Sequence, residues 1–148
     1  MIRRSLAELL GNPESLRDVS VSLIKIADIE VSRGDLDAAL AKYQESLTIF
    51  RSLAQSLGNP QSQRDVAIHL MKIADIEVSR GAVDAALAKH QEALEIRRSL
   101  AQSLGNPESL RDVAISLERI ADIEYSRGDV DAALLKHQEA LEILRSLG

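Results

Sequence analysis

The sequence predicts an all-α fold, an α-solenoid built from antiparallel helical hairpins. Three observations support this prediction: a long internal repeat, apolar residues at helical spacing, and a composition poor in aromatic residues. Of 148 residues, 45% are hydrophobic and 28% are charged, but only 2% are aromatic. This composition favours helices and leaves little material for a β-sandwich or an aromatic-lined cofactor pocket.

The repeat is 47 residues long and is marked by the tripeptide Gly-Asn-Pro, which begins at Gly11, Gly58 and Gly105. The units 11–57 and 58–104 share 35 of 47 residues, and the third unit is 105–148. Residues 2–7 repeat the sequence 96–101, so we expect a partial helix of a preceding unit at residues 1–10. A fixed period of this length predicts one array of two-helix units over residues 1–148.

The first helix of each unit has a clear start signal. Asn12 can cap a helix whose first position is Pro13, where the missing N–H costs nothing, and Asn59 and Asn106 repeat this arrangement. Apolar residues then recur at helical spacing until Gly34, which is expected to end the helix.

The second helix is expected to begin after Asp35, which would cap it, as would Asp129 in the third unit; Ala82 occupies this position in the second. An apolar stripe continues to Gly58, the expected terminator. Helices of about 21 residues, each about 31 Å long, joined by short turns must run antiparallel.

Charge and cysteine content exclude several functions. Eighteen basic and 23 acidic residues give a net charge of −5 and no basic excess for nucleic acid. No apolar run approaches the length needed to span a membrane, and no targeting segment is apparent. The absence of cysteine excludes a disulfide framework and a thiolate metal site. We expect a soluble protein, and a reducing cytoplasm fits.

In the first unit, Leu23, Ile26, Ala27 and Ala39 place apolar and small residues at fixed positions of two helices, and Tyr43 is followed at the same position of the other units by His90 and His137. In this pattern the units resemble tetratricopeptide repeats, in which the Tyr43 position is aromatic. The period is 13 residues longer than the usual 34, and is closer to that of kinesin light chain repeats and bacterial tandem arrays. The resemblance implies a right-handed superhelix.

The resemblance also implies that a peptide or protein segment binds in a concave groove lined by the first helices. A helical wheel places 18 residues on the corresponding helix face, six from each unit. We call these residues the first-helix face: Arg17, Val21, Ile24, Lys25, Asp28, Val31, Arg64, Ile68, Met71, Lys72, Asp75, Val78, Arg111, Ile115, Glu118, Arg119, Asp122 and Tyr125. Their apolar members either contact a ligand or pack between repeats, and the sequence leaves both interpretations open.

The repeated acids of this face, Asp28, Asp75 and Asp122, disfavour a clamp for a peptide carboxylate because like charges repel. A partner with apolar and basic side chains suits the face better.

Two further predictions concern polar residues. Glu30, with its copies Glu77 and Glu124, lies within an apolar stripe and needs a donor. The candidate donors are the residue at the Tyr43 position of the same unit, or the arginines Arg33, Arg80 and Arg127. His90 and His137 are expected to pack rather than bind metal, and His69 is expected on the surface.

No catalytic arrangement, metal site or cofactor site emerges from the sequence, so we expect a binding module rather than an enzyme. The alternatives are a structural module that stacks head to tail with other copies, or an idealised repeat engineered without a natural ligand.

Overall fold

The computed structural model describes residues 12–148, so the predicted partial helix at residues 1–10 lies outside the described residues. Residues 12–148 form six helices and no strand. The helices are α2 (Pro13–Ser32), α3 (Leu36–Leu57), α4 (Pro60–Ser79), α5 (Val83–Leu104), α6 (Pro107–Ser126) and α7 (Val130–Leu147). The predicted all-α solenoid of two-helix units is therefore confirmed, with helices of 18 to 22 residues.

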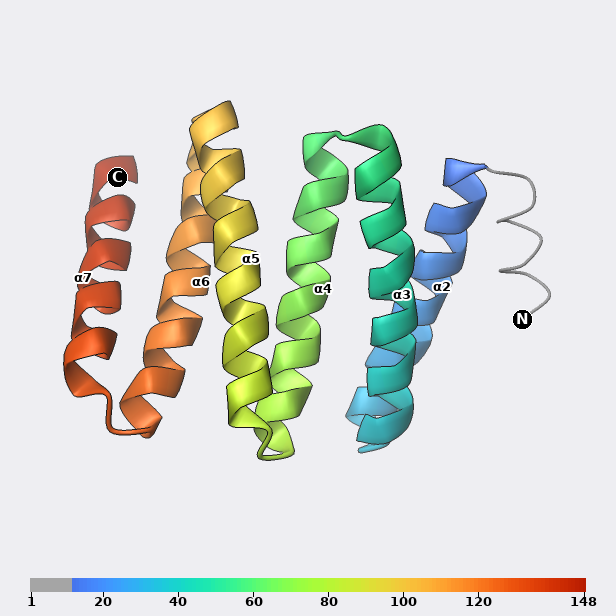
Figure 1. The fold of residues 1–148 in the computed structure, drawn as a ribbon, viewed down its shortest axis with the longest axis horizontal. Helices are drawn as coiled ribbons and strands as arrows, with labels where there is room; N and C mark the ends of the chain where they lie inside the picture. Colours follow the sequence, from blue (N-terminus) through green and yellow to red (C-terminus); the bar gives the residue numbers. More distant parts are fainter. Residues whose placement is uncertain (1–11) are drawn as a thin grey trace. The chain divides into compact units, whose positions relative to one another are not determined.

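The chain forms two compact units, Met1–Ile76 and Glu77–Gly148, whose boundary falls within α4. In the first unit, α2 packs along α3, and α3 also contacts α4. In the second unit, α6 lies between α5 and α7 and packs on both. Figure 1 shows short connections at alternate ends of successive helices, as the predicted turns require.

The predicted asparagine caps are confirmed at all three first helices. The Oδ1 atom of Asn12 accepts from the amide of Glu14 at 2.9 Å. Asn59 and Asn106 accept in the same way from the amides of Ser62 and Ser109, each at 2.8 Å. These bonds satisfy amides that the first helical turn leaves without a partner.

The predicted aspartate caps of the second helices are wrong. The side chains of Asp35 and Asp129 make no capping hydrogen bond. The backbone amide of Asp35 instead donates to the carbonyl of Glu30 at 2.8 Å, and Ala82 makes the same bond to Glu77 at 2.8 Å. Because alanine closes the turn as well as aspartate does, the backbone alone fixes this connection.

The expected glycine terminators are confirmed. Gly34 and Gly58 have φ angles of +82° and +60°, a conformation that is strained for residues with a Cβ atom. The amide of Gly58 donates to the carbonyl of Ala54 at 2.9 Å and closes α3. The chain can therefore reverse within a few residues.

The core follows the predicted apolar stripes. In the first unit Leu23, Ala27, Tyr43 and Phe50 are buried, whereas Leu57 at the end of the α3 stripe is exposed. The second compact unit contains a buried cluster formed by Leu94, Val113, Ala114, Leu117, Ile120 and Ala140.

Within the described residues, no helix has the length and apolar content needed to cross a membrane.

Candidate interaction surface

The first-helix face on α2 is largely exposed. Val21 and Val31 are exposed apolar residues, Lys25 and Asp28 are exposed between them, and Ile24 is half-buried. On this helix, the spacing places apolar and charged side chains on one solvated stripe, as the helical wheel predicts.

The same positions on α4 are more buried. Met71 is only 7% exposed, and Arg64, Ile68 and Lys72 are half-buried. A flexible thioether chain can fill gaps in packing, so Met71 supports the interpretation in which some of these residues pack within the array.

The remaining positions on α4, Asp75 and Val78, are exposed.

The first-helix face on α6 is exposed at all six positions. Its members there are Arg111, Ile115, Glu118, Arg119, Asp122 and Tyr125. Tyr125 has the most exposed side chain among the large apolar residues of the face, at 66%. This helix therefore presents a mixed apolar and charged surface on which every predicted side chain is accessible.

Ion pairs connect α2 with α4, and each of them includes a basic residue of the first-helix face. Arg17 donates to the carboxylate of Asp65 at 2.7 Å, and Lys72 lies 3.4 Å from a carboxylate oxygen of Asp28. Basic residues of this face are thus used partly to join successive first helices. Exposed pairs of this kind contribute little free energy, but they fix the positions of the charges.

Asp28 also accepts a hydrogen bond from the hydroxyl of Tyr43. Burial raises the pKa of the Tyr43 phenol, and the hydrogen bond to Asp28 adds to this effect. The phenol therefore stays protonated and continues to donate. In the third unit, His137 occupies the Tyr43 position, and its Nε2 atom lies 3.5 Å from the carboxylate of Asp122.

The expected donors to the buried glutamates are wrong in all three units. Glu30 accepts from Lys42 at 2.9 Å, and Glu77 and Glu124 accept from Lys89 and Lys136, each at 3.0 Å. The lysine immediately precedes the tyrosine or histidine position, so the prediction was one residue away. Successive side chains of an α-helix point about 100° apart, so the lysine and the tyrosine or histidine that follows it point in different directions.

The expectation that His69 is a surface residue is also wrong. The side chain is 2% exposed. Its Nε2 atom lies 2.9 Å from the hydroxyl of Ser46, its Nδ1 atom lies 2.6 Å from the carbonyl of Asp65, and its ring packs 4.6 Å from that of Phe50. Burial is the main cause of its lowered pKa, which the Asp65 carbonyl partly opposes.

The second compact unit, Glu77–Gly148, has different residues at the positions of Phe50 and His69. Arg97, which replaces Phe50, donates to the hydroxyl of Ser116, which replaces His69, at 3.1 Å. Both sets join the second helix of one hairpin to the first helix of the next. The sequence contains the relevant signal, because both positions change together between units, but the helical wheel of a single helix cannot show which helices meet.

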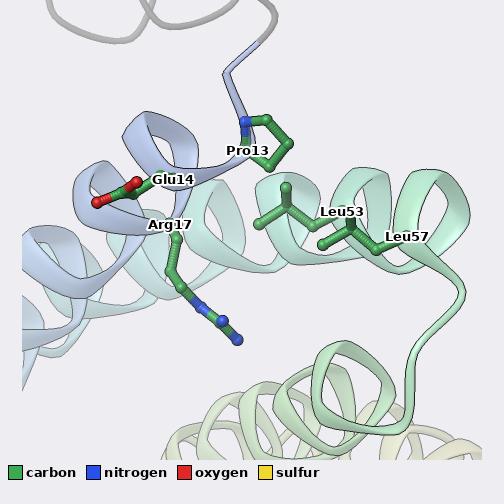
Figure 2. Close-up of a pocket in the computed structure, with 5 residues that line it drawn as sticks. All are labelled: Pro13, Glu14, Arg17, Leu53 and Leu57. Atoms are coloured by element: carbon green, nitrogen blue, oxygen red, sulfur yellow. The ribbon is translucent and has the colours of Figure 1, made fainter.

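A shallow cavity of about 240 Å³ lies beside the beginning of α2. Figure 2 shows Pro13, Glu14 and Arg17 of α2 on one side of this cavity and Leu53 and Leu57 of α3 on the other. Apolar atoms supply most of the lining, and Arg17 is the residue that it shares with the first-helix face. Among residues 12–148, no group of three metal-ligating side chains could hold a metal ion.

Comparisons with known proteins place this fold among helical repeats. No family model and no curated protein matches the sequence. The crystal structure of BtubC (BKLC) from P. vanneervenii superposes with a TM-score of 0.69 at 24% identity, over 98% of this chain and 52% of that chain. This chain thus spans about half the length of BtubC.

Two filament structures, DHF79 and DHF38, each superpose with a TM-score of 0.50, at 22% and 24% identity. They match 95% and 97% of this chain and 76% and 75% of their own chains. Together with the repeated hairpins, these similarities define the chain as an all-α helical repeat protein of the solenoid class.

Proposed function

We propose that this chain is a protein-interaction scaffold that binds a peptide or protein segment along its first-helix face. We also infer that its hairpins are a long-period variant of the tetratricopeptide type. The observation that supports the binding proposal is that all six residues of this face on α6 are exposed. A rigid helix that holds apolar and charged side chains at fixed spacing leaves most of the ordering cost to the ligand.

The charge of the α6 face favours one kind of partner. Glu118 and Asp122 lie between the apolar side chains of Ile115 and Tyr125, and these four positions follow the spacing of one helix face. Such a stripe complements a segment that has basic side chains flanked by apolar ones. Exposed tyrosine is also a frequent source of binding energy at protein interfaces.

A selection from a displayed library of random peptides tests this proposal with the full chain. We expect enriched peptides to combine basic and apolar residues, and we expect Tyr125→Ser with Ile115→Ser to weaken their binding at least about tenfold, equivalent to about 1.4 kcal/mol. Leu135→Ser is the matched control, because Leu135 is an exposed apolar residue of α7.

Circular dichroism must show that both variants keep their helical content. The proposal is contradicted if no peptide is enriched, or if the selected peptides bind the α6 variant as tightly as the control variant.

A further inference from the structure

The first helices differ in how deeply they bury two isoleucines. Ile26 and Ile29 of α2 are 41% and 58% exposed. Their copies in the other two units are all buried: Ile73 and Ile120 at 0%, Ile76 at 5% and Ile123 at 8%. The repeat supplies an internal control, because identical residues at identical helix positions differ only in what lies against them.

The contacts of the copies show which kind of element covers this face. Ile120 of α6 belongs to the same buried cluster as Leu94 of α5, and Ser116, one turn earlier, accepts from Arg97 of α5. In the first compact unit, Met1–Ile76, His69 of α4 occupies the position of Ser116 and contacts α3. This face of a first helix therefore packs against the second helix of the preceding hairpin.

The opposite half of the same interface is uncovered on α7. Leu134, Leu141 and Leu144 are 53%, 46% and 41% exposed. In α5, the equivalent Leu94 and Arg97 are 9% and 7% exposed, because α6 covers them.

We propose that a second copy of this chain covers both faces, with α7 of one copy packed against α2 of the next. By equivalence with Leu94 and Ile120, Leu141 of one copy would contact Ile26 of the other. Leu144 would then face Ser22, in the position of Arg97 and Ser116. Such a contact is heterologous, so the pair keeps one free α2 face and one free α7 face, and further copies can add.

The structure of the chain itself indicates that the partner covering these faces is a second copy. Both complementary faces occur in one chain, and they continue an interface that the chain already forms between α5 and α6. A second copy supplies the equivalent of Leu94 as Leu141, without burying a charged side chain at position 144.

Light scattering coupled to size exclusion, over a range of protein concentrations, tests this proposal with the full chain. We expect the mass of the wild-type protein to rise with concentration. Ile26→Glu blocks the α2 face and Leu141→Glu blocks the α7 face, and each variant alone should be monomeric. An equimolar mixture of the two should form a one-to-one dimer, because each variant keeps the face that its partner lacks.

Two matched controls separate this interface from general stickiness. Val21→Glu, on the first-helix face of α2, should assemble like the wild type. Leu144→Arg should also assemble, since arginine at the equivalent position 97 is buried and donates to Ser116, whereas Leu144→Glu should not. Circular dichroism of each variant reports whether the fold is kept.

Three outcomes would overturn the proposal. They are a wild-type protein that stays monomeric at every concentration, association that persists in both single variants, and a mixture that remains monomeric while the wild type assembles.

Discussion

At the residue scale, each hairpin keeps a carboxylate in an apolar stripe by pairing it with one lysine. Glu77 and Glu124 are buried, and each accepts a charge-assisted hydrogen bond from a lysine 12 residues later. The other oxygen of each carboxylate, Oε1, is buried without a hydrogen-bond partner among the described residues. The lysine is therefore the main compensation for burying the carboxylate.

Lys89→Met tests this dependence. The substitution leaves the Glu77 carboxylate buried without its lysine, and we expect the free energy of unfolding to fall by about 1 to 3 kcal/mol in urea denaturation. Lys25→Met, at an exposed position of α2, should change it by less than about 0.5 kcal/mol. Equal effects of the two substitutions would show that the Lys89 contact has no special weight.

His69 makes stability depend on pH. Its folded-state pKa is lowered, mainly by burial, so the unfolded chain takes up a proton on this side chain at a higher pH than the folded chain does. Its contribution is therefore constant above about pH 6.5, and stability falls as the pH drops from 6.5 through the folded-state pKa. The surrounding groups are Asp65 and Lys72 on α4, Asp28 on α2, and Ser46 on α3.

Urea unfolding between pH 5 and 8 checks this prediction (about 1.4 kcal/mol per pH unit is the most that one proton can contribute). His69→Ser, which installs the residue found at positions 22 and 116, should reduce the loss of stability below pH 6.5. His137→Gln should keep it, since His137 is only half-buried. A wild-type profile that His69→Ser leaves unchanged would contradict the prediction.

At the element scale, the two kinds of helix begin by different means. Each first helix begins at an asparagine whose side chain caps the backbone. Each second helix begins after a tight turn closed by backbone hydrogen bonds, with either aspartate or alanine at the preceding position. Within each hairpin, therefore, a side chain caps the start of the first helix, and backbone hydrogen bonds alone close the turn before the second helix.

Substitutions at the two kinds of start should differ in effect. Asn106→Ala removes a bond of 2.8 Å to the amide of Ser109, and we expect it to lower the free energy of unfolding by about 1 kcal/mol. Ala82→Asp can gain only from the helix dipole, about 0.3 kcal/mol. Thermal denaturation measures both, and a gain of 1 kcal/mol or more from Ala82→Asp would show that aspartate does cap this turn.

At the scale of the whole molecule, neighbouring helices cover one another unequally. In the second unit, α6 packs on both α5 and α7, whereas α7 exposes Leu134, Leu141 and Leu144. In the first unit, α2 exposes Ile26 and Ile29, while α3 contacts both α2 and α4. In repeat proteins, stability is close to a sum of unit and neighbour contributions, so an uncovered face lowers local stability.

Amide hydrogen exchange checks this consequence within each unit. In dilute protein, we expect α7 to exchange faster than α6, and α2 faster than α3, because fewer buried contacts oppose local opening. Raising the protein concentration should slow exchange in α2 and α7 selectively if copies stack. Uniform protection across all six helices would contradict the prediction.

The helices and their order could be predicted from local sequence signals alone. Gly-Asn-Pro, the glycines at positive φ and the apolar spacing act within a few residues, so they can be interpreted without knowing what lies across the core. The first-helix face on α2 and α6 could be predicted for the same reason, since a helix periodicity sets which side chains share a stripe.

Which side chains meet across helices depends on how the helices pack against one another. Lys42 lies beside Glu30, and His69 lies buried between Ser46 and Phe50, because the rotation and spacing of packed helices select those partners. A helical wheel predicts the direction in which a side chain points, but its contacts depend on which helix packs against that side. The same packing leaves Ile26 exposed while it buries the identical Ile73 and Ile120.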